Sequence, residues 1–235
     1  ASMADVIVLS LPLVDALARV AGELAAAGRP NAVAVETGTF PLADKTAARD
    51  VLAGSDIELL DAPLSGTGLQ AADGTLVVLS SGPEPAHRHA LPVFDAIGKQ
   101  TFHLGRFGNG SRMKYVANLL VAVHTLAAAE AHRLGAASGL DPEVVQQVIG
   151  PGAGGSTMFD VRGPMMVAGE YLPPSARLAI ILKDAGIISA HARDVDAPTP
   201  LLDAAIPLYA AGVETGLGDS DAAALRQLLE TWPLD

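Results

Sequence analysis

Two polar residues stand near the start of a long apolar segment. Lys114 and Asn118 lie four residues apart, so an α-helix would place their side chains on one face. A lysine in apolar surroundings can act as a general acid or base, because burial disfavours its charged form and lowers a pKa that is otherwise about 10.4. The alternative is a lysine that extends its charged end from a helix start into solvent.

Two further polar groups interrupt apolar sequence. Ser65, Gly66 and Thr67 come shortly after a predicted strand, and in open α/β sheets ligands gather beyond the carboxyl ends of strands. Lys183 and Asp184 lie inside an otherwise apolar predicted helix. Taken singly, these groups could be an ordinary turn and a helix-edge ion pair. Three such interruptions in one chain favour a shared role in chemistry.

Other candidate sites are weaker. The glycine-rich segment 150–157 follows a predicted helix, so it does not make the strand–GxGxxG–helix pattern that binds a dinucleotide, and we interpret it as a loop. His87 and His89 are predicted to be solvent-exposed residues rather than metal ligands. No metal site is predicted, and the absence of cysteine excludes thiolate ligands and a catalytic thiol.

The helix that must carry Lys114 spans residues 108–138. Gly108 and Gly110 mark a turn, Ser111 can cap the helix, and good helix formers without proline follow. This helix is apolar nearly all round, so we predict that it is buried along much of its length. The apolar residues that recur at spacings of three and four are Val116, Leu119, Leu120, Val123, Leu126 and Ala127.

Elements before this helix alternate between strand and helix, which is typical of a parallel α/β sheet. From residue 108 onward only helices are predicted, so we divide the chain into domains 1–107 and 108–235. The strands are predicted at 6–11, 32–36, 57–60, 77–80 and 101–104, and the helices at 15–27, 42–54, 83–97, 108–138, 141–149, 157–167, 176–194, 199–211 and 219–231.

Composition limits the class of protein. The chain has 235 residues and a net charge of −11, which argues against partners such as nucleic acid or an anionic membrane surface. The longest uncharged apolar stretch, 115–129, is shorter than the ~20 residues that a membrane-spanning helix needs. No secretory signal is visible, and the absence of cysteine fits a reducing compartment. We therefore expect a soluble, cytoplasmic protein.

Together these motifs resemble the β-hydroxyacid dehydrogenase family, which includes 3-hydroxyisobutyrate dehydrogenase, tartronate semialdehyde reductase and 6-phosphogluconate dehydrogenase. The family's substrate-binding pattern is similar to residues 61–67 followed by 72–76, and its late lysine–aspartate pair is similar to Lys183-Asp184. The resemblance spans the chain and implies an incomplete doubly wound parallel (Rossmann-like) sheet followed by an all-helical domain. The family's catalytic GxGxxxKxxxN pattern is matched by Gly108, Gly110, Lys114 and Asn118.

The resemblance implies an oxidoreductase that uses NAD or NADP to oxidise a small 3-hydroxyacid, or to reduce the corresponding semialdehyde. Lys114 would be the general acid/base, and Asn118 would orient the substrate. The substrate carboxylate would bind at Ser65, Gly66 and Thr67, with added positive charge from Lys183. The residues that the resemblance places in contact with the cofactor are Leu11, Pro12, Thr39, Lys183 and Asp184.

Two features depart from the family. Thr67 stands where members usually have a second glycine, which narrows the loop or adds a hydroxyl group. The family's first βαβαβ stretch, with its GxGxxG and the residue that selects NAD or NADP, is absent. We therefore expect an N-terminally incomplete version of a longer protein, in which strand 6–11 lies at a bare sheet edge.

The resemblance leaves several readings of function open. A substrate of the 3-hydroxyisobutyrate or tartronate-semialdehyde type is favoured over 6-phosphogluconate, because no concentration of Arg and His for a phosphate is visible. The resemblance also implies a homodimer or a larger homo-oligomer, because helical second domains of this family pair between subunits, and the apolar helices here agree with that. The alternatives are a non-catalytic remnant that binds a small acid or serves dimerisation, and an imine-reducing relative, in which the lysine is typically replaced.

Overall fold

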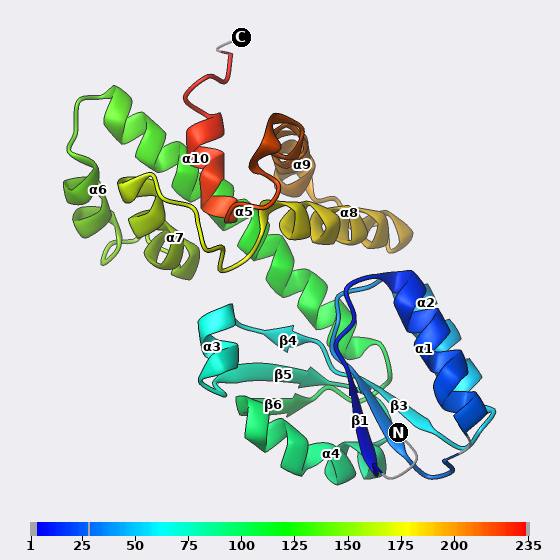
Figure 1. Ribbon diagram of the computed structural model, residues 1–235. Helices are drawn as coiled ribbons and strands as arrows, with labels where there is room; N and C mark the ends of the chain where they lie inside the picture. Colours follow the sequence, from blue (N-terminus) through cyan, green and yellow to red (C-terminus); the bar gives the residue numbers. More distant parts are fainter. Residues whose placement is uncertain (1–3, 28, 234–235) are drawn as a thin grey trace. The chain divides into compact units, whose positions relative to one another are not determined.

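The computed structural model describes residues 4–27 and 29–233 (Figure 1). It divides into two compact units, Ala1–Ala117 and Asn118–Asp235. The division falls inside one long helix, α5 (Asn109–Ala137). The predicted domain border at 107/108 stays a prediction. The first unit is α/β and the second is helical, which confirms the predicted fold class.

Three parallel strands form the first sheet of the α/β unit. β1 (Val6–Leu9), β2 (Val33–Glu36) and β3 (Glu58–Asp61) lie in the order β1-β2-β3. The connections run through α1 (Val14–Ala27) and α2 (Leu42–Ala53), because parallel neighbours need a long crossover. All residues of the central strand β2 are buried, as expected of an apolar run with both faces covered.

β1 is shorter than the sequence predicts. It ends at Leu9, so Leu11 and Pro12 lie in the loop that follows. Among the described residues β1 pairs with β2 alone, and its Val8 side chain is 45% exposed. β1 is therefore an edge strand in the described structure, as expected for strand 6–11, and one of its faces is only partly covered.

A second sheet departs from the predicted all-parallel arrangement. Its central strand β5 (Leu76–Ser80) is antiparallel to β4 (Leu64–Ser65) and parallel to β6 (Gly98–His103). Residues 66–75 join β4 to β5 and hold only the short helix α3 (Gly68–Ala72), which the sequence analysis does not predict. A parallel crossover needs a dozen or more residues, so this shorter connection returns the chain in the opposite direction.

Helices cover both faces of the α/β unit (Figure 1). An antiparallel bridge between Asp61 and Ser81 links the end of β3 to the end of β5. α4 (Glu84–Ile97) packs Phe94 against Val33, Val35, Leu60 and Val78. α1 and α2 pack on the opposite face, where the alternate residues of the same strands point; the buried residues there include Leu17, Leu24, Leu52, Ala34, Ile57 and Leu59.

Helices build the second unit. Leu178, Leu202, Tyr209 and Leu225 are among its most buried side chains. Within the described ranges, none of the helices combines the length and apolar character needed to cross a bilayer. Besides the remainder of α5, the elements are α6 (Pro142–Ile149), α7 (Thr157–Ala168), α8 (Leu178–Asp194), α9 (Pro200–Gly212), the π-helical turn η1 (Val213–Leu217), the 3-10 turn η2 (Ala222–Ala224) and α10 (Leu225–Leu228).

The C-terminal helix is shorter than predicted. Instead of one helix over 219–231, η2 and α10 together span 222–228. Asp221 fixes this start, because its carboxylate accepts a hydrogen bond from the Ala223 amide, as a helix-capping residue does. The same carboxylate pairs with the buried Arg162 guanidinium at 3.0 Å. A tertiary ion pair therefore decides where this helix begins.

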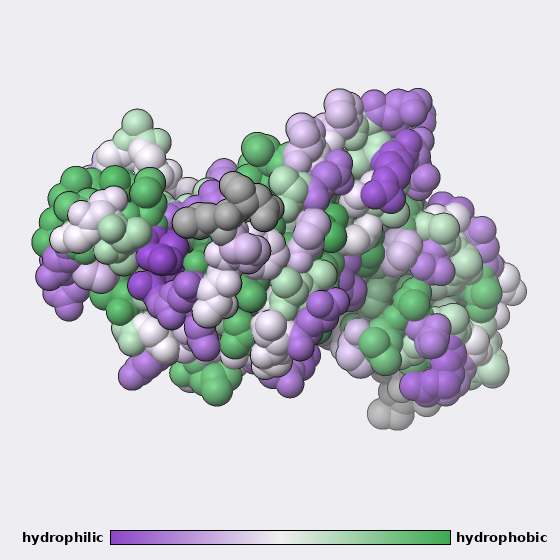
Figure 2. Space-filling model, turned by 90° about the horizontal axis from the view of Figure 1, so that it is seen from above, coloured by the Kyte–Doolittle hydropathy of each residue, from purple (hydrophilic) through white to green (hydrophobic). Residues whose placement is uncertain are grey.

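α5 is less buried than its apolar composition predicts. Met113, Val116 and Leu120 recur along one side of the helix and are 45%, 61% and 47% exposed. α6 also exposes Val144 and Val148, and Figure 2 shows apolar surface gathered over the part of the second unit that holds α6. The prediction of burial is wrong for these positions, because an all-round apolar helix offers more surface than its own neighbours cover.

Candidate active site

The start of α5 lies very close to two strand ends of the first unit. A Cβ atom at Gly110 would lie 2.2 Å from the Leu79 carbonyl oxygen and 2.7 Å from the Asp61 carbonyl oxygen. Gly108 has a φ of 91°, a left-handed conformation that costs glycine little. The two glycines of the GxG pattern therefore serve a turn and a close approach of backbones.

Asp61 anchors this helix start. Its carboxylate accepts hydrogen bonds from the Ser111 amide at 2.8 Å, the Ser111 hydroxyl at 2.7 Å and the Ser81 hydroxyl at 3.1 Å. The Gly110 amide donates to the Ser81 hydroxyl at 2.9 Å. A carboxylate is favoured here because the N-terminus of a helix carries partial positive charge. Ser111 is thus not the cap that the sequence predicts: the helix begins at Asn109, and both Ser111 donors turn to Asp61.

Lys114 lies three residues beyond Ser111 on α5 and is half-buried. Its neighbour Tyr115 is buried, and the Tyr115 hydroxyl donates to the Phe40 carbonyl oxygen at 2.6 Å. The turn that carries Lys114 is therefore held to the end of β3 through Ser111 and to the loop after β2 through Tyr115.

In the second unit, Asp184 gathers the predicted polar residues. Nδ2 of Asn118 donates to Asp184 Oδ2 at 2.7 Å, and Nζ of Lys183 lies 2.9 Å from Asp184 Oδ1. The Lys183 side chain is 37% exposed, whereas Asn118 and Asp184 are buried. Because a carboxylate only accepts hydrogen bonds, Asp184 fixes which end of the Asn118 amide faces it. Asp184 supports Asn118 directly, and its implied contact with a cofactor stays a prediction.

Residues 65–67 form the predicted substrate loop at the end of β4. Gly66 has a φ of 149°, and a Cβ atom there would lie 2.6 Å from Leu76 Cδ2, so glycine suits this position. Gln70 Oε1 accepts from the Thr67 amide at 2.9 Å, and the Gln70 amide donates to the Thr67 hydroxyl at 3.4 Å. These reciprocal bonds make a capping box at the start of α3. Thr67 thus has a structural task, and the T-x-x-Q spacing is the signal that sequence reasoning missed.

The residues predicted to contact a cofactor lie at two neighbouring strand ends. Leu11 and Pro12 follow β1, and Thr39 follows β2. The structure joins these two loops, because the Thr37 amide and hydroxyl both donate to the Leu9 carbonyl oxygen, at 3.0 and 2.9 Å. The carboxyl ends of adjacent parallel strands are where dinucleotides bind in open α/β sheets. This part of the structure therefore fits a nicotinamide cofactor.

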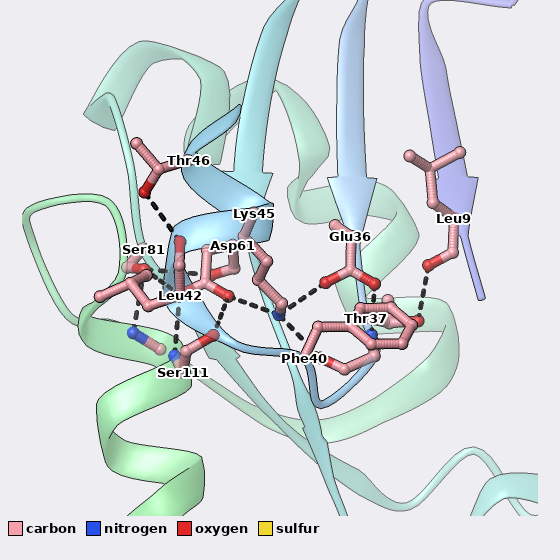
Figure 3. Close-up of polar contacts among 12 residues, drawn as sticks. Leu9, Glu36, Thr37, Phe40, Leu42, Lys45, Thr46, Asp61, Ser81 and Ser111 are labelled. Atoms are coloured by element: carbon pink, nitrogen blue, oxygen red, sulfur yellow. Dashed lines mark hydrogen bonds and ion pairs between the residues drawn. The ribbon is translucent and has the colours of Figure 1, made fainter. Parts of the chain in front are cut away.

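Sequence reasoning missed a buried ion cluster beside these loops (Figure 3). Nζ of Lys45 lies 2.5 Å from Glu36 Oε2 and 2.8 Å from Asp61 Oδ1, and all three side chains are fully buried. Burial raises the pKa of the Glu36 carboxyl above its ordinary value, and Lys45 opposes that shift. The signal was available: Lys45 shares the inner face of α2 with Ala48 and Leu52, where a lysine is out of place without a partner.

The histidine prediction is half right. His89 is exposed, as expected. His87 is buried: its Nδ1 lies 3.0 Å from the Ser80 hydroxyl, and its ring stacks on His103 at 4.5 Å between centroids. Burial, and next the neighbouring His103, lower the pKa of His87. The surface assignment of His87 is therefore wrong, because the inner face of α4 takes the ring.

Two hollows in the first unit lie away from the residues predicted to bind substrate and cofactor. They measure about 360 and 590 Å³ and share Glu58 at the start of β3, whereas the predicted site residues follow strand ends. Within the described part of the chain, no group of three or more His, Asp or Glu residues is arranged to hold a metal ion.

Comparison with known proteins finds relatives that cover both units. Residues 1–105 match the NAD binding domain of 6-phosphogluconate dehydrogenase, and residues 108–229 match the NAD-binding domain of NADP-dependent 3-hydroxyisobutyrate dehydrogenase. L-threonate dehydrogenase of Escherichia coli K12 is 34% identical over 201 residues, which are 85% of this chain and 66% of that protein. The enzyme of the same name from Cupriavidus necator is 37% identical over 205 residues, 87% of this chain and 69% of that protein.

The chain thus spans about two thirds of the length of these relatives. Among solved structures, 3-hydroxyisobutyrate dehydrogenase from Salmonella typhimurium superposes with a TM-score of 0.90 at 30% identity, over 97% of this chain and 80% of that one. An imine reductase from Streptomyces aurantiacus shares the fold at a TM-score of 0.57 and 19% identity, over 97% of this chain and 80% of that one. Two NAD(P)-binding family models therefore cover nearly all of the sequence, and the chain belongs to the β-hydroxyacid dehydrogenase family.

Proposed function

We propose that the protein interconverts a small 3-hydroxyacid and its oxoacid with NAD or NADP, and that Lys114 is the general acid/base. The observation that carries this proposal is the placement of Lys114: it is half-buried on a turn bonded to two strand-end loops. Asn118 follows one helical turn later and is held by Asp184. A proton-transfer group must be held in a fixed position, and both features supply this.

Each residue then has a defined task. When bound, the nicotinamide supplies the hydride acceptor or donor. Lys114 accepts the proton of the substrate hydroxyl in oxidation and returns it to the alkoxide in reduction. Asn118, oriented by Asp184, binds the reacting oxygen. Ser65 and the Gly66 amide bind the carboxylate, and Lys183 adds positive charge.

The cofactor would lie against Leu11, Pro12 and Thr39 at the ends of β1 and β2. Thr67 contributes less to the substrate than the resemblance implies, since its amide and hydroxyl already bond to Gln70.

For the substrate, we propose a four-carbon hydroxyacid and place L-threonate first and 3-hydroxyisobutyrate second, ahead of the three-carbon tartronate semialdehyde. The support is the name shared by the relatives that are 34% and 37% identical. The choice between NAD and NADP is part of the same test.

The experiment measures NAD(P)H formation with L-threonate and with 3-hydroxyisobutyrate, in the protein and in its Lys114→Ala variant. We expect the variant to lose about 10²- to 10⁴-fold in kcat, the range of general acid–base catalysis. Lys99→Ala is the matched control, because Lys99 is an exposed lysine of the same unit. Cofactor titration followed by fluorescence should give similar affinities for all three proteins. An unchanged rate in Lys114→Ala would remove Lys114 from the mechanism, and acid binding without turnover would favour the non-catalytic alternative.

We also propose that the protein is a homodimer or a larger homo-oligomer in the cytoplasm. The exposed apolar side of α5, formed by Met113, Val116 and Leu120, supports association, because single-sided apolar surfaces of this kind mark protein interfaces. Sedimentation of the protein and of a Val116→Glu variant tests this: a monomeric wild-type protein would refute it.

A further inference from the structure

The buried ion cluster of Glu36, Lys45 and Asp61 joins two parts of the proposed site (Figure 3). Each of the three charges comes from a different element: the end of β2, the first turns of α2 and the end of β3. Breaking a buried ion pair leaves an unpaired charge in a medium of low dielectric, which is strongly unfavourable. The cluster therefore holds these elements in one arrangement.

On one side, the cluster fixes the loop that precedes the proposed cofactor contact. Lys45 Nζ donates to the Gly38 carbonyl oxygen at 2.7 Å, and the Gly38 amide donates to Glu36 Oε1 at 2.7 Å. Gly38 is thus bonded through both of its backbone groups, directly before Thr39. A loop with its backbone groups satisfied by buried charges has little freedom to move.

On the other side, the cluster fixes the start of α5. Asp61 Oδ1 accepts from both Lys45 Nζ and the Ser111 hydroxyl, and Oδ2 accepts from the Ser111 amide. A helix is a rigid element, so a fixed first turn determines where the Lys114 ammonium group can lie one turn later. The Asp61 carboxylate therefore links the loop on the cofactor side to the helical turn that carries Lys114.

We propose that Asp61 and Lys45 are positioning residues of the reaction: through this cluster they hold the Gly38–Thr39 loop and the Lys114 turn at a fixed separation. The proposal rests on the proposed function for its catalytic consequence, while the mechanical link can be measured without turnover. Misplacement by about 1 Å can cost a reaction 10²-fold, so the link should affect kcat more than substrate binding.

The test uses Ser111→Ala, which removes one bond to Asp61 and leaves the cluster charges intact, alongside Asp61→Asn. Ser138→Ala is the matched control, because Ser138 lies just beyond the other end of α5 and its hydroxyl donates to the Leu134 carbonyl oxygen of that helix at 2.8 Å. With L-threonate and NAD(P), we expect Ser111→Ala to lower kcat about tenfold while KM changes less than about twofold. Ser111→Thr, which keeps the hydroxyl, should restore kcat.

A second measurement does not depend on turnover. Labelling with an amine-reactive ester, read by mass spectrometry, should modify Lys114 on the order of threefold faster in Ser111→Ala, because the loosened turn opens more often. Exposed Lys99 is the internal control and should react equally in all variants. Equal Lys114 labelling in Ser111→Ala, Asp61→Asn and Ser138→Ala would overturn the proposal. Faster labelling in a protein that oxidises neither hydroxyacid would uphold the link and refute the proposed function instead.

Discussion

Gly110→Ala tests whether the start of α5 depends on backbone contact with the strands. The added methyl group would lie 2.2 Å from the Leu79 carbonyl oxygen and 2.7 Å from the Asp61 carbonyl oxygen. Both obstacles are backbone atoms at strand ends, so the helix start must move. Overpacking of this kind costs about 1–3 kcal/mol, and loss of the Gly110–Ser81 bond adds about 1 kcal/mol. Alanine returns up to about 1 kcal/mol through its helix propensity.

The expected net loss is about 1–4 kcal/mol in the free energy of unfolding, which corresponds to a Tm lower by roughly 2–16 °C for a chain of this length. Urea unfolding followed by circular dichroism measures it as a lower midpoint. Gly22→Ala in α1 is the matched control: apart from the adjoining backbone of its own helix, no described atom lies within 4 Å of its added Cβ, so it should stabilise the protein by up to about 1 kcal/mol. A Gly110→Ala midpoint equal to that of the wild type would refute the reasoning.

Three other perturbations concern buried charge. Asp221→Asn should destabilise the second unit by about 3–5 kcal/mol, because it leaves the Arg162 guanidinium buried and unpaired; a change below about 1 kcal/mol in urea unfolding would contradict this. Lys45→Met removes the cation that opposes the raised pKa of Glu36. A carboxyl group whose pKa is raised in the folded protein favours folding at low pH and opposes it as pH rises. The free energy of unfolding that Lys45→Met loses relative to wild type should therefore be larger at about pH 7 than at about pH 5. Burial lowers the pKa of His87 from 6.5. Its contribution to the stability of the fold is therefore present above pH 6.5 and is lost as pH falls through the lowered pKa. His87→Gln should therefore make Tm fall less between about pH 7 and pH 5, and an identical slope would exclude His87 as the cause.

The sequence predicts the longer elements in the correct order because their apolar runs and helical periods are clear, but it misses the short elements β4 and α3. The family resemblance and the NAD(P)-binding character are confirmed by both family models. What the sequence cannot show is contact between distant residues. The position of Lys45 on the inner face of α2 indicates that it needs a partner, but only the structure shows that Glu36 and Asp61 lie beside it.

One local signal was missed, and elsewhere a tertiary contact outweighed the local pattern. The antiparallel β4–β5 pair depends on the short connection 66–75, whose capping box at Thr67 and Gln70 makes a helix of its own. The helix predicted from 219 begins instead at Ala222, because Asp221 turns to Arg162. The roles of the individual site residues stay predictions, since geometry places them without showing what they do.

The Asn118–Asp184 bond has a consequence for which substitutions the site tolerates. Asparagine and aspartate have nearly the same shape, yet the carboxylate of Asn118→Asp would meet the buried Asp184 oxygen across the 2.7 Å that now holds an N–H donor. Two carboxyl groups at that distance cannot both stay ionised. Asn118→Asp thus changes the shape of the side chain very little but adds a negative charge beside Asp184. Asn118→Ala, which removes the amide without adding charge, should destabilise the protein less.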